Sequence, residues 1–415
     1  MNGEALARFA PREGAASDEI VGVRPKLVFA PEKSEDAAAL MAELAAQRLV
    51  VAFVGGGTQV GLGAPPERLD AVISTRRLNQ IVEYAPSDQI VVAQAGITLS
   101  ALQQKLAEAG QRLALDPPWP DRATLGGIVA SNAFGPLRTR YGSIRDLIIG
   151  IHFIRADGVA ARGGGKVVKN VAGFDLPKLL VGSLGTLGLI TTVTCRLHPL
   201  PEKQVTLLMP NRTAASVRAL VAQIRAAQLE PAAVVALREG TGFAVSVRFE
   251  GFQAGVEDQK ERLISLVSPQ GPCSALDEAG ARDFAARHDR VRVGGTLRTK
   301  IAALPGSLDT VVPECVVPLC ESLEHAGFVS YPTLGIGFVS GDVNTVARAS
   351  EAIATARGAL ARLGGSLVLE EAPAEVRARC DVWGQTKSAL SLMRSVKARL
   401  DPEHRMAPGR FVGGN

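Results

Sequence analysis

The feature that most constrains this chain is a run of three glycines placed directly after an apolar segment. Residues 49–54 are all apolar and predict a buried strand, and Gly55-Gly56-Gly57-Thr58 follows at once. Residues without a Cβ let the backbone approach a ligand closely, and their N–H groups can form a concave site for a pyrophosphate. Taken alone, the segment fits an ordinary glycine-rich turn equally well.

Two familiar phosphate loops do not fit this segment. A Walker A loop needs Gly-Lys followed by Ser or Thr, and no such triplet follows the glycines. In a Rossmann fingerprint counted from Gly55, Val60 stands where the last glycine belongs. A dinucleotide site built on this loop would therefore be of another type.

Strand-like and helix-like segments alternate around the loop, which favours layered α/β packing. Residues 26–31 and 90–95 predict strands, and helices are expected to begin with Ser34 as N-cap and with Thr98 or Ser100 as N-cap. After Pro199-Leu200-Pro201, two strand–helix–strand sets indicate an antiparallel sheet with helices on one face. We therefore expect an α+β protein with domains at residues 1–200 and 201–372 and a C-terminal segment, residues 373–415, that returns to the first domain.

A second glycine-rich stretch spans residues 116–142. Its Gly126-Gly127 and Ser131-Asn132 would let a large planar ring lie against the backbone, and Ser131 and Asn132 can bond to ring heteroatoms. A surface loop rich in proline and glycine is the alternative. Three further side chains of this stretch can meet a phosphate or a substrate: Arg138, Arg140 and Tyr141.

A third stretch, residues 166–191, holds the turn Gly182-Ser183-Leu184-Gly185-Thr186-Leu187-Gly188 before an apolar strand. Together the three stretches resemble, in order and spacing, the FAD-binding domain of the vanillyl-alcohol-oxidase and p-cresol-methylhydroxylase family. The motifs are GGGT at residues 55–58, ATLGGIVASNAFG at 123–135 and KNVAGFDLPKLLVGSLGTLGLIT at 169–191. The resemblance covers about residues 22–200, and the ending Pro408-Gly409-Arg410-Phe411 is also similar to that of relatives.

The resemblance implies a two-domain α+β flavoprotein, with a p-cresol-methylhydroxylase-type FAD-binding domain and an antiparallel-sheet cap domain. It implies that residues 55–59 hold the FAD pyrophosphate and that the backbone of Ile190 meets the adenine end. The residues implied to contact the cofactor are Val54, Gly55, Gly56, Gly57, Thr58, Gln59, Gly61, Pro117, Thr124, Gly126, Gly127, Ser131, Asn132, Gly135, Arg138, Tyr141, Gly188 and Ile190.

Some family members attach FAD covalently through a histidine near the pyrophosphate loop. The first histidine of this chain is His152, so the resemblance implies non-covalent FAD. Catalytic relatives that oxidise 2-hydroxy acids carry a His-x-His metal motif in the cap and an acidic residue inside the Gly-Ser-x-Gly-Thr turn. Here Leu184 fills the acidic position and neither HxH nor HxxxH occurs, so we assign no metal site and no catalytic residue.

Within the family, the chain looks similar to the FAD-binding accessory subunits of bacterial glycolate oxidases, through Asp116-Pro117-Pro118, Trp383-Gly384 and the PGRF ending. This implies flavin-mediated oxidation of glycolate to glyoxylate within a complex. The implied partners are a related FAD-containing catalytic subunit and an iron–sulfur subunit. The alternatives are a self-sufficient FAD-dependent oxidoreductase acting on a hydroxy acid or alcohol, and a non-catalytic FAD-binding scaffold.

The cap region contains a basic segment, residues 287–300, in which Arg298 could hold a substrate carboxylate through two parallel hydrogen bonds. A solvated face or a subunit contact is the alternative for this segment. The net charge of +5 is otherwise spread along the chain, which argues against nucleic-acid binding.

The five cysteines form no CxxC pair, which argues against zinc, an iron–sulfur cluster or a disulfide framework. We expect no signal peptide and no integral membrane segment. The expected location is the cytoplasm, with peripheral contact to the inner membrane through the complex as the alternative.

Overall fold

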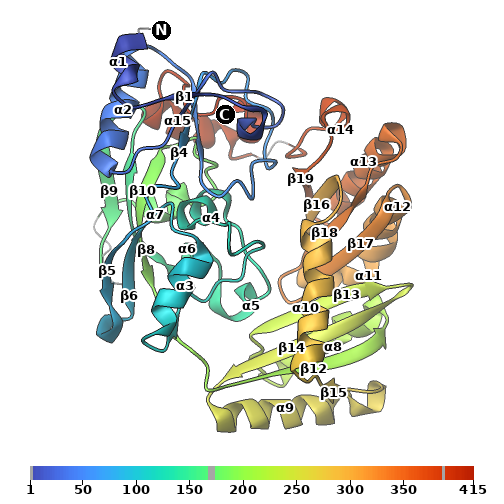
Figure 1. Ribbon diagram of the computed structural model, residues 1–415. Coiled ribbons are helices and arrows are strands. Elements are labelled where there is room, and N and C mark those ends of the chain that lie inside the picture. The colour runs from blue at the N-terminus through green and yellow to red at the C-terminus, as the bar shows by residue number, and fades with distance from the viewer. Residues whose placement is uncertain (1–2, 167–172, 386–387) are drawn as a thin grey trace. The chain divides into compact units, whose positions relative to one another are not determined.

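The computed structural model describes residues 3–166, 173–385 and 388–415 (Figure 1). The chain divides into two compact units: unit 1 comprises Met1–Phe134, Gly142–Pro199 and Gln385–Asn415, and unit 2 comprises Gly135–Tyr141 and Leu200–Gly384. The sequence-based boundaries differ, because they place residues 135–141 in the first domain and the return of the chain at residue 373. The mixture of helices and sheets confirms the predicted α+β class.

Unit 1 contains a small sheet in the order β1-β2-β4-β3, in which β2, β4 and β3 run parallel. Helix α2 packs Leu40, Met41 and Leu44 into the core beside this sheet, as their helical spacing predicts. The prediction that Ser34 caps this helix is wrong, since Lys33 is the N-cap and Ser34 begins the helix. The elements are β1 (Arg12–Glu13), β2 (Leu27–Phe29), β3 (Val51–Val54), β4 (Ala71–Ser74), α1 (Gly3–Ala7) and α2 (Ser34–Ala46).

A second sheet of unit 1 is antiparallel, in the order β5-β6-β10-β8-β9. Its apolar face packs against α3, whose N-cap is Thr98 as one of the two predicted alternatives: the Thr98 hydroxyl accepts a hydrogen bond from the Ala101 N–H at 3.3 Å. The strands of this sheet are β5 (Ile81–Ala85), β6 (Ile90–Gln94), β8 (Ile148–Ile154), β9 (Ala160–Gly164) and β10 (Leu189–Arg196). A separate pair is formed by β7 (Gln111–Arg112) and β11 (His198–Pro199). The helices are α3 (Leu99–Ala107), α4 (Leu125–Ser131), α6 (Ile144–Leu147) and α7 (Leu176–Leu180).

The C-terminal segment belongs to unit 1, where α15 (Leu390–Leu400, red in Figure 1) lies among the N-terminal elements drawn in blue. Beyond α15 the chain joins the edge of the small sheet. The Val51 N–H donates to the Arg405 carbonyl at 2.8 Å, and the Ala407 N–H donates to the Val51 carbonyl at 2.8 Å. The end of the sequence is thereby held beside the strand that leads into the glycine loop.

Unit 2 is built on an eight-stranded antiparallel sheet in the order β15-β12-β14-β13-β17-β18-β16-β19. Its strands are β12 (Lys203–Arg212), β13 (Ala233–Glu239), β14 (Gly242–Gly251), β15 (Ser274–Ala275), β16 (Leu297–Ala302), β17 (Glu324–Tyr331), β18 (Ile336–Asp342) and β19 (Ser366–Glu371). Its helices are α5 (Arg138–Tyr141), α8 (Ala214–Ala226), α9 (Gln253–Val267), α10 (Glu278–Val293), α11 (Leu308–Val311), α12 (Val317–Glu321), α13 (Val346–Arg362) and α14 (Ala374–Arg379).

In the described parts of the chain, none of the helices combines the length and the apolar composition that crossing a lipid bilayer requires.

Candidate functional site

A cavity of about 830 Å³, including the part open to solvent, lies in unit 1 where β3 ends in the glycine loop. The loop, the start of α4, the turn before β10 and residues of the C-terminal segment form its walls. Of the residues predicted to contact a cofactor, the cavity is lined by Val54, Gly55, Gly56, Gly57, Thr58, Gln59, Thr124, Gly126, Gly127, Ser131, Gly188 and Ile190.

The remaining predicted residues lie elsewhere. Gly61, Pro117 and Asn132 belong to unit 1 but are not among the residues that line the cavity. Gly135, Arg138 and Tyr141 belong to the short segment that groups with unit 2. Contact between FAD and any of these predicted residues stays a prediction.

The glycine loop owes its orientation to Arg76, which follows β4. The Arg76 guanidinium donates to the carbonyls of Gly55, at 3.0 Å, and of Gly56, at 3.2 Å. Because a trans peptide unit points its C=O and N–H in opposite directions, these bonds aim the next two N–H groups away from Arg76. Arg76 is exposed and no sequence motif surrounds it, so the sequence did not predict this role.

Four successive N–H groups of the loop, those of residues 56–59, donate to no backbone or side-chain acceptor within the described residues. Backbone donors in folded proteins are nearly always satisfied, by protein, water or ligand. A row of such donors lining a cavity is the arrangement that binds phosphate oxygens through main-chain N–H groups. The loop therefore has the chemistry that the sequence predicted for a pyrophosphate site.

Two glycines of the loop are required for different physical reasons. A Cβ on Gly56 would lie 1.6 Å from the carbonyl oxygen of Arg122, so no larger residue fits without moving backbone. Gly57 has φ +74°, a conformation that costs other residues strain, while the space around it is open. The first glycine permits close packing and the second permits the bend.

Helix α4 supplies a wall of small side chains. Its N-cap Thr124 accepts a hydrogen bond from the Gly127 N–H at 3.3 Å, and the Ser131 hydroxyl donates to the Gly127 carbonyl at 2.7 Å. Asn132 ends the helix with φ 51°, and its buried Oδ1 has no hydrogen-bond partner among the described residues. An unsatisfied buried acceptor of this kind calls for an explanation, for which a ligand is one candidate.

The turn at residues 182–188 packs on α4. The Gly182 N–H donates to the Val129 carbonyl at 2.9 Å, and the Leu184 N–H donates to the Ala130 carbonyl at 2.8 Å. Leu184, at the position where the family resemblance implies an acid in catalytic relatives, lines the cavity with an apolar side chain. The preceding part of this motif, residues 167–172, lies outside the described residues.

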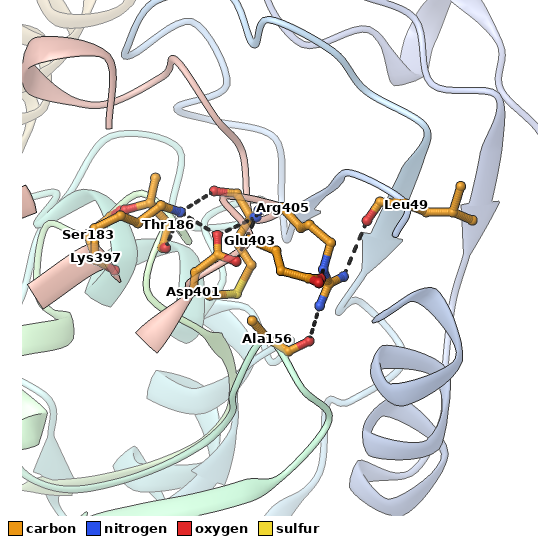
Figure 2. Close-up of polar contacts among 9 residues, drawn as sticks. Leu49, Ala156, Ser183, Thr186, Lys397, Asp401, Glu403 and Arg405 are labelled. Carbon is orange, nitrogen blue, oxygen red and sulfur yellow. Dashed lines mark hydrogen bonds and ion pairs between the residues drawn. The ribbon is translucent and has the colours of Figure 1, made fainter. Parts of the chain in front are cut away.

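A buried ionic group holds the C-terminal segment against this turn, as Figure 2 shows. The Lys397 ammonium donates to the Thr186 carbonyl at 2.8 Å, to the Met406 carbonyl at 2.8 Å and to Asp401 Oδ2 at 2.7 Å. All three N–H groups of Lys397 thus have acceptors. Asp401 accepts further bonds from the N–H groups of Arg405 and Met406. Burial lowers the pKa of Lys397, and the Asp401 carboxylate opposes that shift.

The C-terminal segment also contributes residues that the sequence-based prediction did not include. Ala407 and Arg410 line the cavity. The PGRF ending was noticed as a family resemblance. Nothing in its residue types indicated that Arg410 contacts Val60, a lining residue 350 positions away in the sequence. Other lining residues that were missed are Ile20, Ala52, Phe53, Val60, Thr75, Ala95, Ala130, Leu184, Gly185 and Leu189.

Arg298, the predicted substrate contact, lies on β16 in unit 2. Its guanidinium donates to Glu371 Oε2 at 3.4 Å and to the Val293 carbonyl at 3.3 Å. Burial lowers the pKa of Arg298, while the carboxylate of Glu371 opposes the shift. The structure therefore engages Arg298 within its own unit, and a substrate role stays a prediction.

The interpretation of the basic segment as a solvated face is wrong for two of its residues. His288 and Arg292 are buried on α10. His288 Nε2 lies 2.8 Å from the Tyr331 hydroxyl, and the Arg292 guanidinium lies over the Phe338 ring at 3.4 Å, next to Glu370. These side chains belong to the core of unit 2. Among the described residues, no group of three or more His, Cys, Asp or Glu side chains is placed to hold a metal ion.

Comparison with known proteins agrees with this geometry. Residues 25–164 match the family described as "FAD binding domain". The chain is 25% identical over 421 residues to glycolate oxidase subunit GlcD of Bacillus subtilis (strain 168), covering 93% of this chain and 89% of that protein. It is 34% identical over 210 residues to glycolate oxidase subunit GlcE of Escherichia coli (strain K12), covering 50% of this chain and 58% of that protein.

The solved structure of p-cresol methylhydroxylase with substrate bound superposes with a TM-score of 0.74 at 14% identity, over 99% of this chain and 92% of that one. This confirms the predicted fold. The protein is an FAD-dependent oxidoreductase. The oxidoreductase has a cavity that fits its cofactor, because the glycine loop offers backbone donors for a pyrophosphate while small and apolar side chains leave room for a planar ring.

Proposed function

We propose that the cavity of unit 1 holds FAD non-covalently and that the protein acts as the FAD-binding subunit of a complex that oxidises glycolate or a related 2-hydroxy acid. The observation that carries the first part is the row of N–H groups at residues 56–59, which have no acceptor among the described residues and belong to residues that line the cavity. Bound FAD would supply the redox chemistry of the oxidation.

The chain's own residues would bind and orient the cofactor. Backbone donors of the loop would hold the pyrophosphate, the small residues of α4 would let the ring lie close to the backbone, and Leu184 would exclude water from one side. Asn132 Oδ1 would gain a partner if a ligand donor reaches it. The predicted contacts of Gly61, Pro117, Gly135, Arg138 and Tyr141 belong to this proposal too.

The proposal of a complex rests on the relatives. Both GlcD and GlcE are named as subunits of glycolate oxidase. The sequence also lacks the HxH motif, and Leu184 replaces the acid of catalytic relatives. Oxidation of a hydroxy acid needs a base for the hydroxyl proton and a group that orients the carboxylate. We infer that a related FAD-containing catalytic subunit supplies these groups and that an iron–sulfur subunit is the other partner.

The experiment is purification of the protein from its native cell, followed by identification of attached chains, a flavin spectrum and acid precipitation. We expect partner subunits and a flavin that stays in the supernatant, because no side chain attaches it. The chain alone should oxidise glycolate and D-lactate poorly, and adding its partners should restore turnover.

A self-sufficient oxidoreductase is the second candidate, and the alignment over 94% of the chain with the probable mitochondrial D-lactate dehydrogenase of Danio rerio, which is not named as a subunit, favours it. Fast turnover of glycolate by the isolated chain would establish that candidate and contradict the complex. Flavin on the denatured pellet would contradict non-covalent binding. A flavin that stays oxidised throughout turnover of the complex would leave a scaffold role.

A further inference from the structure

Arg410 combines two properties that few arginines share. It is 5% exposed, and it lines the cavity of unit 1. Among the described residues that line this cavity, it carries the only charged side chain. A ligand that enters the cavity therefore meets one fixed positive charge.

The position of this charge is set by the chain that continues from the glycine loop. Arg410 Nη2 donates to the carbonyls of Val60, at 3.0 Å, and of Leu62, at 2.6 Å, and Nη1 donates to the Ala64 carbonyl at 3.4 Å. The Ala64 N–H donates back to the Arg410 carbonyl at 3.0 Å. Val60 itself lines the cavity and follows residues 56–59 directly. The guanidinium is thus anchored beside the row of backbone donors.

We propose that Arg410 supplies the positive charge that binds the pyrophosphate of FAD. The inference rests on the proposed location of FAD in this cavity. Backbone N–H groups bring only partial charges to a doubly negative pyrophosphate, and a full charge acts strongly where water is excluded.

The same segment offers a matched control in Arg405. Its side chain is 4% exposed, donates to the backbone carbonyls of Leu49 and Ala156 and pairs with the half-exposed Glu403, but it does not line the cavity. Arg405→Met therefore removes a buried, carbonyl-bound arginine from the same segment without removing charge from the cavity.

The test compares binding of FAD and of riboflavin, which lacks the pyrophosphate, to the flavin-free full chain by quenching of flavin fluorescence. Arg410→Met should raise the Kd for FAD roughly tenfold to hundredfold, the range for a charged hydrogen bond, and change the Kd for riboflavin by less than about threefold. Arg410→Lys should recover part of the loss. Arg405→Met should change both Kd values by the same factor.

Equal weakening of both flavins by Arg410→Met, or no change in either, would overturn the inference. If Arg410→Met does not fold, the wild-type protein is tested instead. Its Kd for FAD should rise with NaCl concentration more steeply than its Kd for riboflavin. Equal slopes would overturn the inference. Gly57→Val distinguishes a failure of the proposed FAD location from a failure of the proposed role of Arg410. If Gly57→Val still binds FAD, the proposed location of FAD is wrong. If Gly57→Val loses FAD but Arg410→Met weakens both flavins equally, the location stands and only the proposed role of Arg410 is wrong.

Discussion

Two walls of the same cavity are built by opposite means. The glycine loop, residues 55–59, offers bare backbone and no charged side chain. Residues 397–410 of the C-terminal segment are held by buried ionic groups, with the side chains of Lys397 and Asp401 only 1% and 0% exposed. The glycine wall depends on residues that have no side chain. The C-terminal wall depends on charges that are costly to bury unless each has a partner. Loss of a partner should therefore damage the second wall more.

The largest effect is expected from Lys397→Met, which leaves the Asp401 carboxylate buried without its cation. Removal of one partner from a buried pair costs about 3–5 kcal/mol of the free energy of unfolding. Urea denaturation monitored by circular dichroism measures this loss. The control is Lys105→Met, since Lys105 pairs with Glu108 at the surface and should contribute about 1 kcal/mol at most.

A double variant, Lys397→Met with Asp401→Leu, should regain part of that loss, because no charge then remains unpaired. A loss no larger for Lys397→Met than for Lys105→Met would show that the C-terminal wall does not depend on the ion pair.

The next effect concerns the glycine wall. Gly57→Val should raise the Kd for FAD by more than about a hundredfold, because Val is strained at φ +74° and its methyl groups project into open space beside the loop. Flavin occupancy of the purified variant, with circular dichroism as a check on folding, measures this. Gly240→Val is the matched control, since Gly240 in unit 2 also has positive φ, +57°, and open space around it. Normal flavin occupancy in Gly57→Val would move the pyrophosphate site elsewhere.

The smallest effect is expected at Thr124, which caps α4 with its side chain. Thr124→Val removes the N-cap of α4 and should cost about 1 kcal/mol of stability, together with a few-fold increase in the Kd for FAD. Thr213→Val removes the equivalent cap of α8 in unit 2, where Thr213 accepts from the Ser216 N–H at 3.1 Å. It should cost similar stability and leave the Kd unchanged. Equal effects of both variants on FAD binding would deny Thr124 a local role.

The two walls also differ in how far the sequence could predict them. Gly55–Gly57 could be predicted as a ligand loop only together with the two later glycine-rich stretches, because alone they fit an ordinary turn equally well. Thr98 was one of two predicted caps of its helix. Arg76 and Arg410 could not be found in this way, because their acceptors are carbonyls of residues remote in sequence. Helix α10 was missed because its sequence is dominated by charges, of which Arg292 is buried beside Glu370 and over the Phe338 ring.

The most direct measurement of the central claim is hydrogen exchange at the N–H groups of residues 56–59, with and without FAD. These groups have no acceptor among the described residues of the protein, so they should exchange fast in the flavin-free chain. FAD should slow them strongly, because its pyrophosphate becomes their acceptor. Exchange at residues 56–59 that is unchanged when FAD is bound would contradict the claim that this loop holds the cofactor.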